Sequence, residues 1–368
     1  MGPPNADVAP IERTRVDAYV IPTDTPESDG TFAWDSTTLV VVHVQAGGRI
    51  GIGYTYADRA SAELIADKLA PLIAKCNALD INARWVDMTR AIRNLGRPGI
   101  CAMAIAAVDN ALWDLKAKLF DVSLATLLGR TRPGIPIYGS GGFTSYSDDQ
   151  LRAQLGGWVK LGITKVKMKV GRDPARDLAR VRVAREAIGA ETELFVDANG
   201  AYTRKQALAF AQAYAECGVT WFEEPVSSDD LAGLRLLRDR APAGMAISAG
   251  EYGYDPIYFR RMLEAQAVDV LQADATRCGG VTGFLAAAAL AEAFAVPLSS
   301  HCAPSLHAPL CCAVRAAVHL EYFHDHVRIE HMLFDGALDP VDGSLTPDVT
   351  RPGLGIEFKE QDAQCYKI

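Results

Sequence analysis

The sequence lacks the features that mark secreted, membrane-spanning and disulfide-stapled proteins. Its eight cysteines in 368 residues include no Cys-x-x-Cys pair, which argues against a disulfide framework and favours reduced thiols. The longest stretch without Asp, Glu, Lys or Arg, residues 293–314, contains three prolines and two histidines, unlike a lipid-spanning helix. The N-terminal residues 1–10 are proline-rich and lack the apolar core of a signal peptide. We therefore expect a cytoplasmic protein with no membrane partner.

Basic residues are also in the minority. There are 37 Lys and Arg against 45 Asp and Glu, a formal net charge of −8, and no basic stretch compensates for it. Phosphate binding needs clustered basic side chains, so a nucleic-acid partner is excluded. Hydrophobic residues make up 49% of the chain, which is ample for a core and excludes a disordered protein.

The first third of the chain reads as an α+β unit. Residues 11–56 predict strand–turn–strand, with a β-branched apolar run at 38–44 and a turn at Gly47-Gly48. A polar loop is expected at residues 22–35, before the apolar run. Residues 60–130 show the amphipathic spacing of helices. We therefore predict an α+β capping domain over residues 1–132.

After residue 132 the sequence pattern changes to short apolar runs that alternate with helical segments. The polar residue near the end of each run recurs every 20 to 28 residues, about the length of one βα unit. This predicts a (β/α)8-type barrel over residues 133–330, and residues 331–368 would return to the first domain. The strand candidates are residues 135–138, 165–170, 193–197, 219–223, 246–251, 268–272, 295–299 and 318–321.

Three carboxylates end neighbouring predicted strands. Asp197, Glu223 and Glu251 fall at the ends of strands three, four and five, where the active sites of such barrels lie. Converging carboxylates repel one another, and a hard divalent cation would resolve that conflict. Ligation by oxygen alone selects Mg²⁺, or Mn²⁺, over zinc. The alternative is three separately solvated or helix-capping acids.

A lysine pair occupies the second predicted strand. Lys167 and Lys169 are two residues apart, so both point into the barrel while their neighbours face the helices. Two inward ammonium groups would lower each other's pKa, and one could then act as a base. The alternative is solvated strand-end charge.

Acid/base residues also end the last three predicted strands. Asp274 and His301 end strands six and seven, and a carboxylate beside an imidazole fixes its tautomer and raises its basicity. A ligand above the cation would then have a Lys on one face and a His on another, which suits proton removal and delivery. Glu321 ends strand eight and is either a hydrogen-bonding partner for a substrate carboxylate or a surface acid.

Three further histidines resemble a zinc cluster only superficially. His319, His324 and His326 are close in sequence, but their spacing fits no common zinc site and no Cys pair accompanies them.

Together these residues resemble the enolase superfamily, mandelate racemase subgroup, over nearly the whole chain. The likeness implies a modified, enolase-like (β/α)8 barrel with an N-terminal α+β capping domain. It also implies a homo-oligomer. The matching stretches are residues 167–171 with the Lys-x-Lys motif, 196–200, 221–225, 249–251, 274–283 and 299–301.

The resemblance also implies a role for each residue of the site. The family reaction removes the proton α to a carboxylate and gives a metal-stabilised enediolate. Roles carried over by position are Mg²⁺ ligation by Asp197, Glu223 and Glu251; proton abstraction by Lys169, with Lys167 tuning it and touching the substrate carboxylate; acid/base work by His301 with Asp274; electrophilic assistance by Glu321; and substrate contact by Asn199.

We expect dehydration of a sugar acid, an aldonate or aldarate, as the activity. The alternatives are a racemase, epimerase or cycloisomerase that uses the same bases and, outside enzymes, a non-catalytic metal-binding barrel. Specificity is expected in capping loops at residues 22–35 and 54–56. Tyr54 and Arg277 are further candidate substrate contacts.

Overall fold

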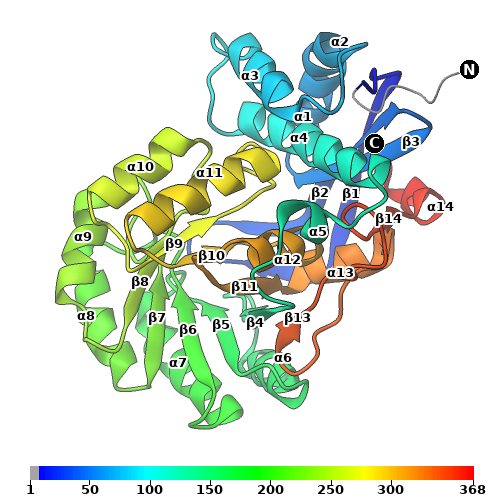
Figure 1. Cartoon of the computed structure of the whole chain (residues 1–368). Helices are drawn as coiled ribbons and strands as arrows, with labels where there is room; N and C mark the ends of the chain where they lie inside the picture. Colours follow the sequence, from blue (N-terminus) through cyan, green and yellow to red (C-terminus); the bar gives the residue numbers. More distant parts are fainter. Residues whose placement is uncertain (1–7) are drawn as a thin grey trace, which may run out of the picture.

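The computed structural model describes residues 8–368 and begins with a small α+β unit (Figure 1). Residues 1–7, part of the proline-rich N-terminus, lie outside the described residues. The unit is a three-stranded antiparallel sheet in the order β1-β2-β3, followed by helices. Its elements are β1 (Arg13–Ser28), β2 (Ala33–Ala46), β3 (Arg49–Tyr56), α1 (Arg59–Leu64), α2 (Ala70–Ile73), α3 (Ile81–Ala91), α4 (Ile100–Leu119) and α5 (Leu124–Leu128).

The loop expected at residues 22–35 is mostly strand, so that expectation was wrong. β1 continues to Ser28 and pairs with the start of β2, after a bulge that ends at Glu27. The bulge accommodates the prolines that suggested a loop. The Asp29 side chain accepts hydrogen bonds from two backbone N–H groups of the turn, at 2.6 and 2.7 Å, and this reverses the chain. We call residues 22–37 the capping hairpin.

Helix α4 packs against β3 at a distance that only glycine allows. A Cβ atom added to Gly53 would lie 2.2 Å from the carbonyl oxygen of Ala107 and 2.3 Å from the backbone nitrogen of Ala111. The obstructing atoms are backbone atoms of α4, which cannot rotate aside as a side chain can. The helix and the strand would therefore have to separate to admit one methyl group.

We expect the substitution Gly53→Ala to lower the free energy of unfolding by about 3 kcal/mol, the upper part of the range for overpacking a core. The matched control is Gly157→Ala in the barrel helix α6 (Asp148–Lys160), where an added Cβ meets nothing within 4 Å. That change should stabilise the protein by about 0.5–1 kcal/mol, because alanine favours helix over glycine. Urea denaturation of both variants measures the difference, and equal midpoints would contradict the packing argument.

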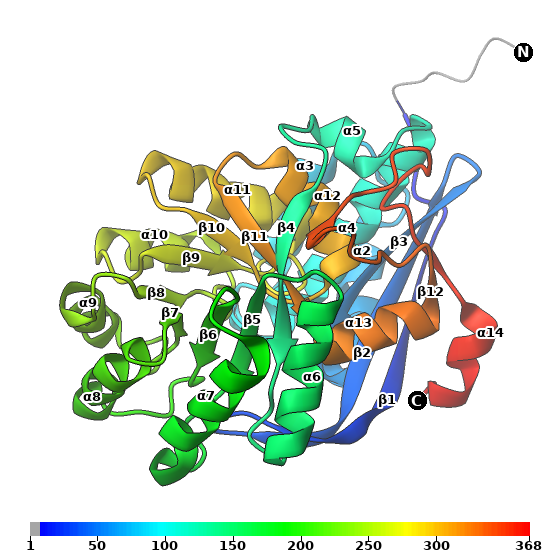
Figure 2. The same ribbon diagram turned by 90° about the horizontal axis from the view of Figure 1, so that it is seen from below.

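The second unit is a closed parallel barrel, as predicted. Strands β4 to β11 pair in chain order, and β11 pairs with β4 to close the ring. Figure 2 shows the strands inside a ring of helices. Its elements are β4 (Ile135–Gly141), α6, β5 (Lys165–Lys169), α7 (Pro174–Ile188), β6 (Glu193–Asp197), α8 (Arg204–Ala215), β7 (Val219–Glu223), α9 (Leu231–Arg240), β8 (Ala246–Ala249), α10 (Pro256–Glu264), β9 (Val270–Ala273), α11 (Gly280–Ala293), β10 (Leu298–Ser300), α12 (Pro304–Ala313), β11 (Ala317–Phe323) and α13 (His324–Leu333).

Aromatic side chains fill the lower part of the barrel interior. The buried rings of Tyr138, Phe195 and Trp221 form one cluster, and the Phe195 and Trp221 rings stack with centroids 5.1 Å apart. His319 packs edge-on against Tyr138 and Trp221, at 5.0 and 5.2 Å. These residues form the aromatic floor, which lies below the strand ends that carry the candidate site.

The last segment runs back to the first unit. β13 pairs with β4, Glu360 forms an ion pair with Arg15, and the Phe358 ring packs on Tyr19 at 5.2 Å. Within residues 8–368, no helix has the length and apolar character needed to cross a bilayer. The remaining strands and α-helix are β12 (Phe334–Asp335), β13 (Ser344–Leu345), β14 (Glu357–Phe358) and α14 (Glu360–Ala363). A π-helical turn (Ile65–Leu69) joins α1 to α2, and a 3₁₀ turn (Gln364–Tyr366) follows α14.

Candidate functional site

The barrel brings the predicted strand-end residues together at one end. Each lies at the end of its strand or within two residues of it, so the register of the parallel strands sets their common height. Glu321 differs slightly from expectation, because β11 continues two residues beyond it, to Phe323. The residues so placed are Lys169 on β5, Asp197 on β6, Glu223 on β7, Glu251 after β8, Asp274 after β9, His301 after β10 and Glu321 in β11.

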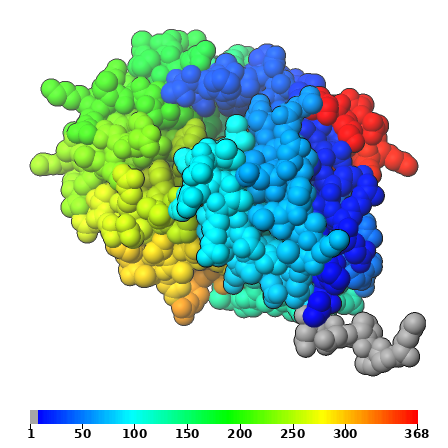
Figure 3. Space-filling view, turned by 90° about the horizontal axis from the view of Figure 1, so that it is seen from above, coloured from blue at the N-terminus to red at the C-terminus, as the bar shows by residue number. Residues whose placement is uncertain are grey.

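A cavity of about 390 Å³ lies over these strand ends, and both units line it. Figure 3 shows the blue N-terminal segment reaching across the green part of the barrel. The expected capping loops therefore do contribute, although the first of them is a hairpin. Lining residues from the barrel include Lys169, Asn199, Glu251, Asp274, Arg277 and His301, and those from the cap include Asp29, Thr31, Phe32, Trp34 and Tyr56.

The three predicted metal ligands meet at one point. One carboxylate oxygen from each of Asp197, Glu223 and Glu251 lies within 4.8 Å of the others, and all three side chains are buried. Oε2 of Glu251 has no hydrogen-bond partner within residues 8–368. Burial, together with Asp197, raises the pKa of Glu223 to about 8. Such a crowded set of buried carboxylates fits a hard divalent cation.

The aromatic floor orients one of these carboxylates. The indole Nε1 of Trp221 donates a hydrogen bond to Oε2 of Glu223 at 2.9 Å. Glu223 therefore has one oxygen fixed from below, while the other contacts the ammonium group of Lys167. Outer partners of this kind hold a metal ligand in one orientation.

Lys167 and Lys169 of β5 point inward, as the alternation predicts, and both are buried. The Lys169 ammonium lies 2.5 Å from Oδ2 of Asp197, and Lys167 lies 2.9 Å from Oε1 of Glu321. The expectation that the lysine pair leaves one of the two with a lowered pKa was wrong. Burial and Lys167 lower the pKa of Lys169, but Asp197, Glu251 and Glu223 outweigh them, and the net pKa is raised.

His301 and Asp274 form the expected pair. Nδ1 of His301 lies 2.8 Å from Oδ2 of Asp274, whose pKa stays below its usual range despite burial because His301 binds it. An ionised carboxylate only accepts, so Nδ1 carries the proton and Nε2 faces Glu251, at 3.4 Å. Burial lowers the pKa of His301, Glu251 raises it, and the net pKa is raised.

Glu321 and Lys167 lie beneath the cavity and do not line it. Lys167 keeps the pKa of Glu321 well below its usual value despite burial, and the backbone N–H of Cys302 donates to Oε2 at 3.0 Å. The arrangement favours an ionised Glu321, whereas electrophilic assistance by a donated hydrogen bond needs the protonated form. Lys167 contacts the carboxylates of Asp197, Glu223 and Glu321.

Tyr54 does not line the cavity, although it was a candidate substrate contact. Its ring is fully buried, and its hydroxyl donates to Glu330 at 2.6 Å. Tyr56, two residues later, does line the cavity and stacks on His326, with centroids 3.4 Å apart. The sequence analysis considered His326 only as part of a histidine group that fits no zinc site, because only the fold brings α13 beside β3.

His307, which the sequence analysis did not single out, holds together the loops beside His301. Its Nε2 accepts a hydrogen bond from the backbone N–H of Ala275 at 2.8 Å, and its Nδ1 donates to the carbonyl oxygen of Cys302 at 2.8 Å. Because Nε2 accepts from an N–H group it carries no proton, so the ring is neutral, and burial lowers the pKa of His307 in the same sense. It thereby ties the loop after β9 to the loop after β10.

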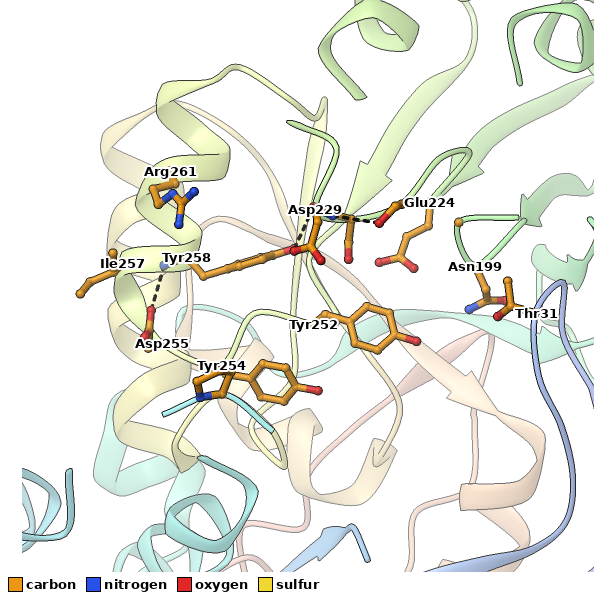
Figure 4. A pocket seen from close by; sticks show the side chains of 14 residues that line it. Thr31, Asn199, Glu224, Asp229, Tyr252, Tyr254, Asp255, Ile257, Tyr258 and Arg261 are labelled. Atoms are coloured by element: carbon orange, nitrogen blue, oxygen red, sulfur yellow. Dashed lines mark hydrogen bonds between the residues drawn. The ribbon is translucent and has the colours of Figure 1, made fainter. Parts of the chain in front are cut away.

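A second cavity of about 740 Å³ adjoins the first (Figure 4). The two share Thr31, Asn199 and Tyr252 as lining residues. In the close-up, Tyr258 and Arg261 lie on α10, across the cavity from Asn199, and the Tyr258 ring points from the helix toward Asp229. The side chain of Arg277 lies over the Tyr252 ring at 5.3 Å and reaches Oε1 of Glu251 at 3.2 Å. The second cavity therefore extends the open space beside the strand-end cavity.

Comparison with known proteins places the chain among enzymes. Residues 150–363 match the family model described as enolase C-terminal domain-like, and residues 16–129 match the N-terminal domain of mandelate racemase / muconate lactonizing enzyme. A 3,6-anhydro-alpha-L-galactonate cycloisomerase from Streptomyces coelicolor is 33% identical over 94% of this chain and 96% of its own length.

Solved structures show the same similarity. A mandelate racemase/muconate lactonizing enzyme-like protein from Rubrobacter xylanophilus is 55% identical, with a TM-score of 0.95 over 98% of this chain and 100% of its own. An L-talarate dehydratase from Polaromonas, complexed with Mg and L-glucarate, is 31% identical, with a TM-score of 0.88 over 98% of each chain.

Proposed function

The chain belongs to the enolase superfamily, in the mandelate racemase subgroup, and from this membership we propose that it is a sugar-acid dehydratase. The proposed reaction removes the proton α to the carboxylate of an aldonate or aldarate and expels the β-hydroxyl as water, giving a 2-keto-3-deoxy acid. The observation that carries the proposal is the placement of Lys169 and His301 on non-neighbouring strands around one cavity, beside three converging carboxylates. A two-step proton transfer needs such an arrangement.

Mg²⁺ is the proposed cofactor, with Asp197, Glu223 and Glu251 as its ligands. The cation would supply positive charge that offsets these carboxylates and stabilises the enediolate. Among relatives, the Polaromonas dehydratase is complexed with Mg and a sugar acid. The buried, oxygen-only donor set of this chain is consistent with the same ion.

The proposed steps use this chain's own side chains. A cation at Asp197, Glu223 and Glu251 would offset the negative charge that raises the pKa of Lys169, so that its side chain could lose a proton. The neutral Nζ of Lys169 takes the α-proton, and the C–H electron pair enters the enediolate. Those electrons then expel the β-oxygen, which leaves with the proton from Nε2 of His301 as water. Asp274 holds the other ring nitrogen, so the imidazole can give up its proton without turning. The resulting enol becomes the 2-keto acid, with Asn199 and Arg277 as proposed substrate contacts.

The substitution Trp221→Phe should weaken Mg²⁺ binding about tenfold, because Glu223 loses the hydrogen bond that orients it. The control is Trp158→Phe in α6, which removes the same side-chain volume. The Trp158 indole is buried and packs on Gly139, away from the carboxylates. Isothermal titration with Mg²⁺ measures both. Equal weakening in the two variants would assign the effect to packing and contradict the orienting role.

The test of the proposed function is proton NMR with Mg²⁺ and a panel of sugar acids in D₂O. We expect one acid to lose its α-proton and yield a 2-keto-3-deoxy product. Exchange of the α-proton without loss of water would instead favour a racemase, epimerase or cycloisomerase, an alternative to which the 33% identical cycloisomerase lends support. Absence of exchange with every acid would contradict both.

A further inference from the structure

A second cluster of metal-binding groups lies outside the catalytic cavity, where the capping hairpin meets the end of β11. One ligand atom from each of Asp24, Glu27 and His324 lies within 4.8 Å of the other two. Nε2 of His324 is 2.9 Å from Oδ2 of Asp24. The two acids come from β1 and the histidine from the first residue of α13, so the cluster joins the two units of the fold.

Glu27 provides an observation independent of this clustering. Its side chain is 1% exposed, and its Oε2 accepts a hydrogen bond from the indole of Trp34 at 2.8 Å. Its other oxygen, Oε1, has no hydrogen-bond partner within residues 8–368. A buried carboxylate oxygen without a partner is costly, and a bound cation would satisfy it.

The nearby basic side chain is committed elsewhere. Arg328 donates to Oδ1 of Asp325 at 2.6 Å and to the carbonyl oxygen of Pro22 at 2.7 Å. The second oxygen of Asp325 accepts from the hydroxyl of Thr37. Asp325 and Arg328 thus satisfy each other, and within residues 8–368 Arg328 donates to neither Asp24 nor Glu27.

The bulge in β1 explains how two acids three residues apart reach the same point. In a regular strand, residues i and i+3 point to opposite faces. The register of β1 against β2 shifts between Pro22 and Glu27, which frees this segment from strand alternation. Asp24 then extends toward His324, while Glu27 stays buried beneath the hairpin.

We propose that Asp24, Glu27 and His324 form a second divalent-cation site, of the zinc class, that fastens the capping hairpin to the barrel. One imidazole nitrogen with two carboxylates suits Zn²⁺ better than Mg²⁺. The side chains of Asp24 and His324 are 44% and 26% exposed, which leaves room for entry of the ion and for water ligands. This site is separate from the catalytic carboxylates and does not depend on the proposed function.

The site would act on the catalytic cavity through Trp34. Glu27 would bind the ion through Oε1, and its Oε2 accepts the hydrogen bond from the Trp34 indole. Trp34 in turn lines the cavity. The Trp34 ring also packs edge-on against Phe143 at 5.7 Å. An ion at the cluster would therefore restrict both the hairpin and one wall of the cavity.

The test compares Zn²⁺ stoichiometry by equilibrium dialysis in the wild-type protein and two histidine variants. We expect the wild type and His331→Ala to bind one equivalent more than His324→Ala. His331 lies on the same helix, is 37% exposed and pairs with Asp339, so it controls for loss of a surface histidine. Any Zn²⁺ held by the catalytic carboxylates is common to all three proteins and cancels. Equal stoichiometry in all three would overturn the proposal.

Two further measurements guard against misfolding and adventitious binding. The half-exposed Asp24 can be replaced with alanine without opening the core, and Asp24→Ala should weaken the extra site about tenfold or more. Hydrogen exchange in residues 22–37 should slow on addition of Zn²⁺ in the wild type and stay unchanged in His324→Ala. Zn²⁺ binding that leaves wild-type exchange unaltered would overturn the fastening of the hairpin.

Discussion

Replacing Lys169 with methionine is expected to slow α-proton abstraction by about 10²- to 10⁴-fold, the contribution of a positioned general base. Methionine keeps the length of the side chain and removes its only proton acceptor. The same change should leave Mg²⁺ affinity equal or tighter, because the ammonium that contacts Asp197 is lost. Single-turnover exchange in D₂O and Mg²⁺ titration separate these two effects.

The control for this variant stands on the same strand. Lys165 begins β5, forms an ion pair with Glu193 and lies at the end of the barrel away from the cavity. Lys165→Met should therefore change the rate of α-proton exchange by less than about twofold. The reason is that a surface ion pair has little effect on a reaction step at the other end of the barrel. If both variants slow exchange alike, Lys169 is not the base.

Removing one ligand charge should have a comparably large effect on metal binding. Asp197→Asn replaces a buried carboxylate with a neutral amide, and the lost attraction to a divalent ion is worth several kcal/mol, so affinity should fall by about 100-fold or more. Catalysis should fall with it and recover partly at high Mg²⁺. Calorimetric titration and activity as a function of Mg²⁺ concentration measure the two.

Its control again uses the other end of a strand. Glu193→Gln at the start of β6 removes the same charge from the same strand, but far from the converging carboxylates. Mg²⁺ affinity should be unchanged in that variant. A loss of affinity in Glu193→Gln equal to that in Asp197→Asn would show that net charge, and not ligation, governs binding.

The barrel and the strand-end residues could be predicted because each depends on local pattern. A polar residue at the close of an apolar run needs only the count of residues per βα unit, which is why Asp197, Glu223 and His301 were found. The tenth strand was placed too early, at residues 295–299. The backbone of Ala295 is left-handed, at φ 54°, and closes the preceding helix, so β10 begins only at Leu298.

What escaped prediction depends on contacts distant in sequence. Tyr54 and Tyr56 share one face of β3, but only packing against α13 decides which of them reaches the cavity. The raised pKa of Lys169 likewise depends on carboxylates from other strands, which outweigh the neighbouring lysine that the sequence showed. His307 acts between two loops that meet only in the folded barrel.

The aromatic floor has a consequence for substrate entry and product release. Because Tyr138, Phe195, Trp221 and His319 fill the barrel below the strand ends, the cavity is closed on the barrel side, and it adjoins the second cavity on the outer side. Substrate would enter and product would leave on the same side of the barrel. A new substrate would therefore bind only after the product has been released. Raising the viscosity of the solvent would then slow product release. The rate of the chemical step would stay the same.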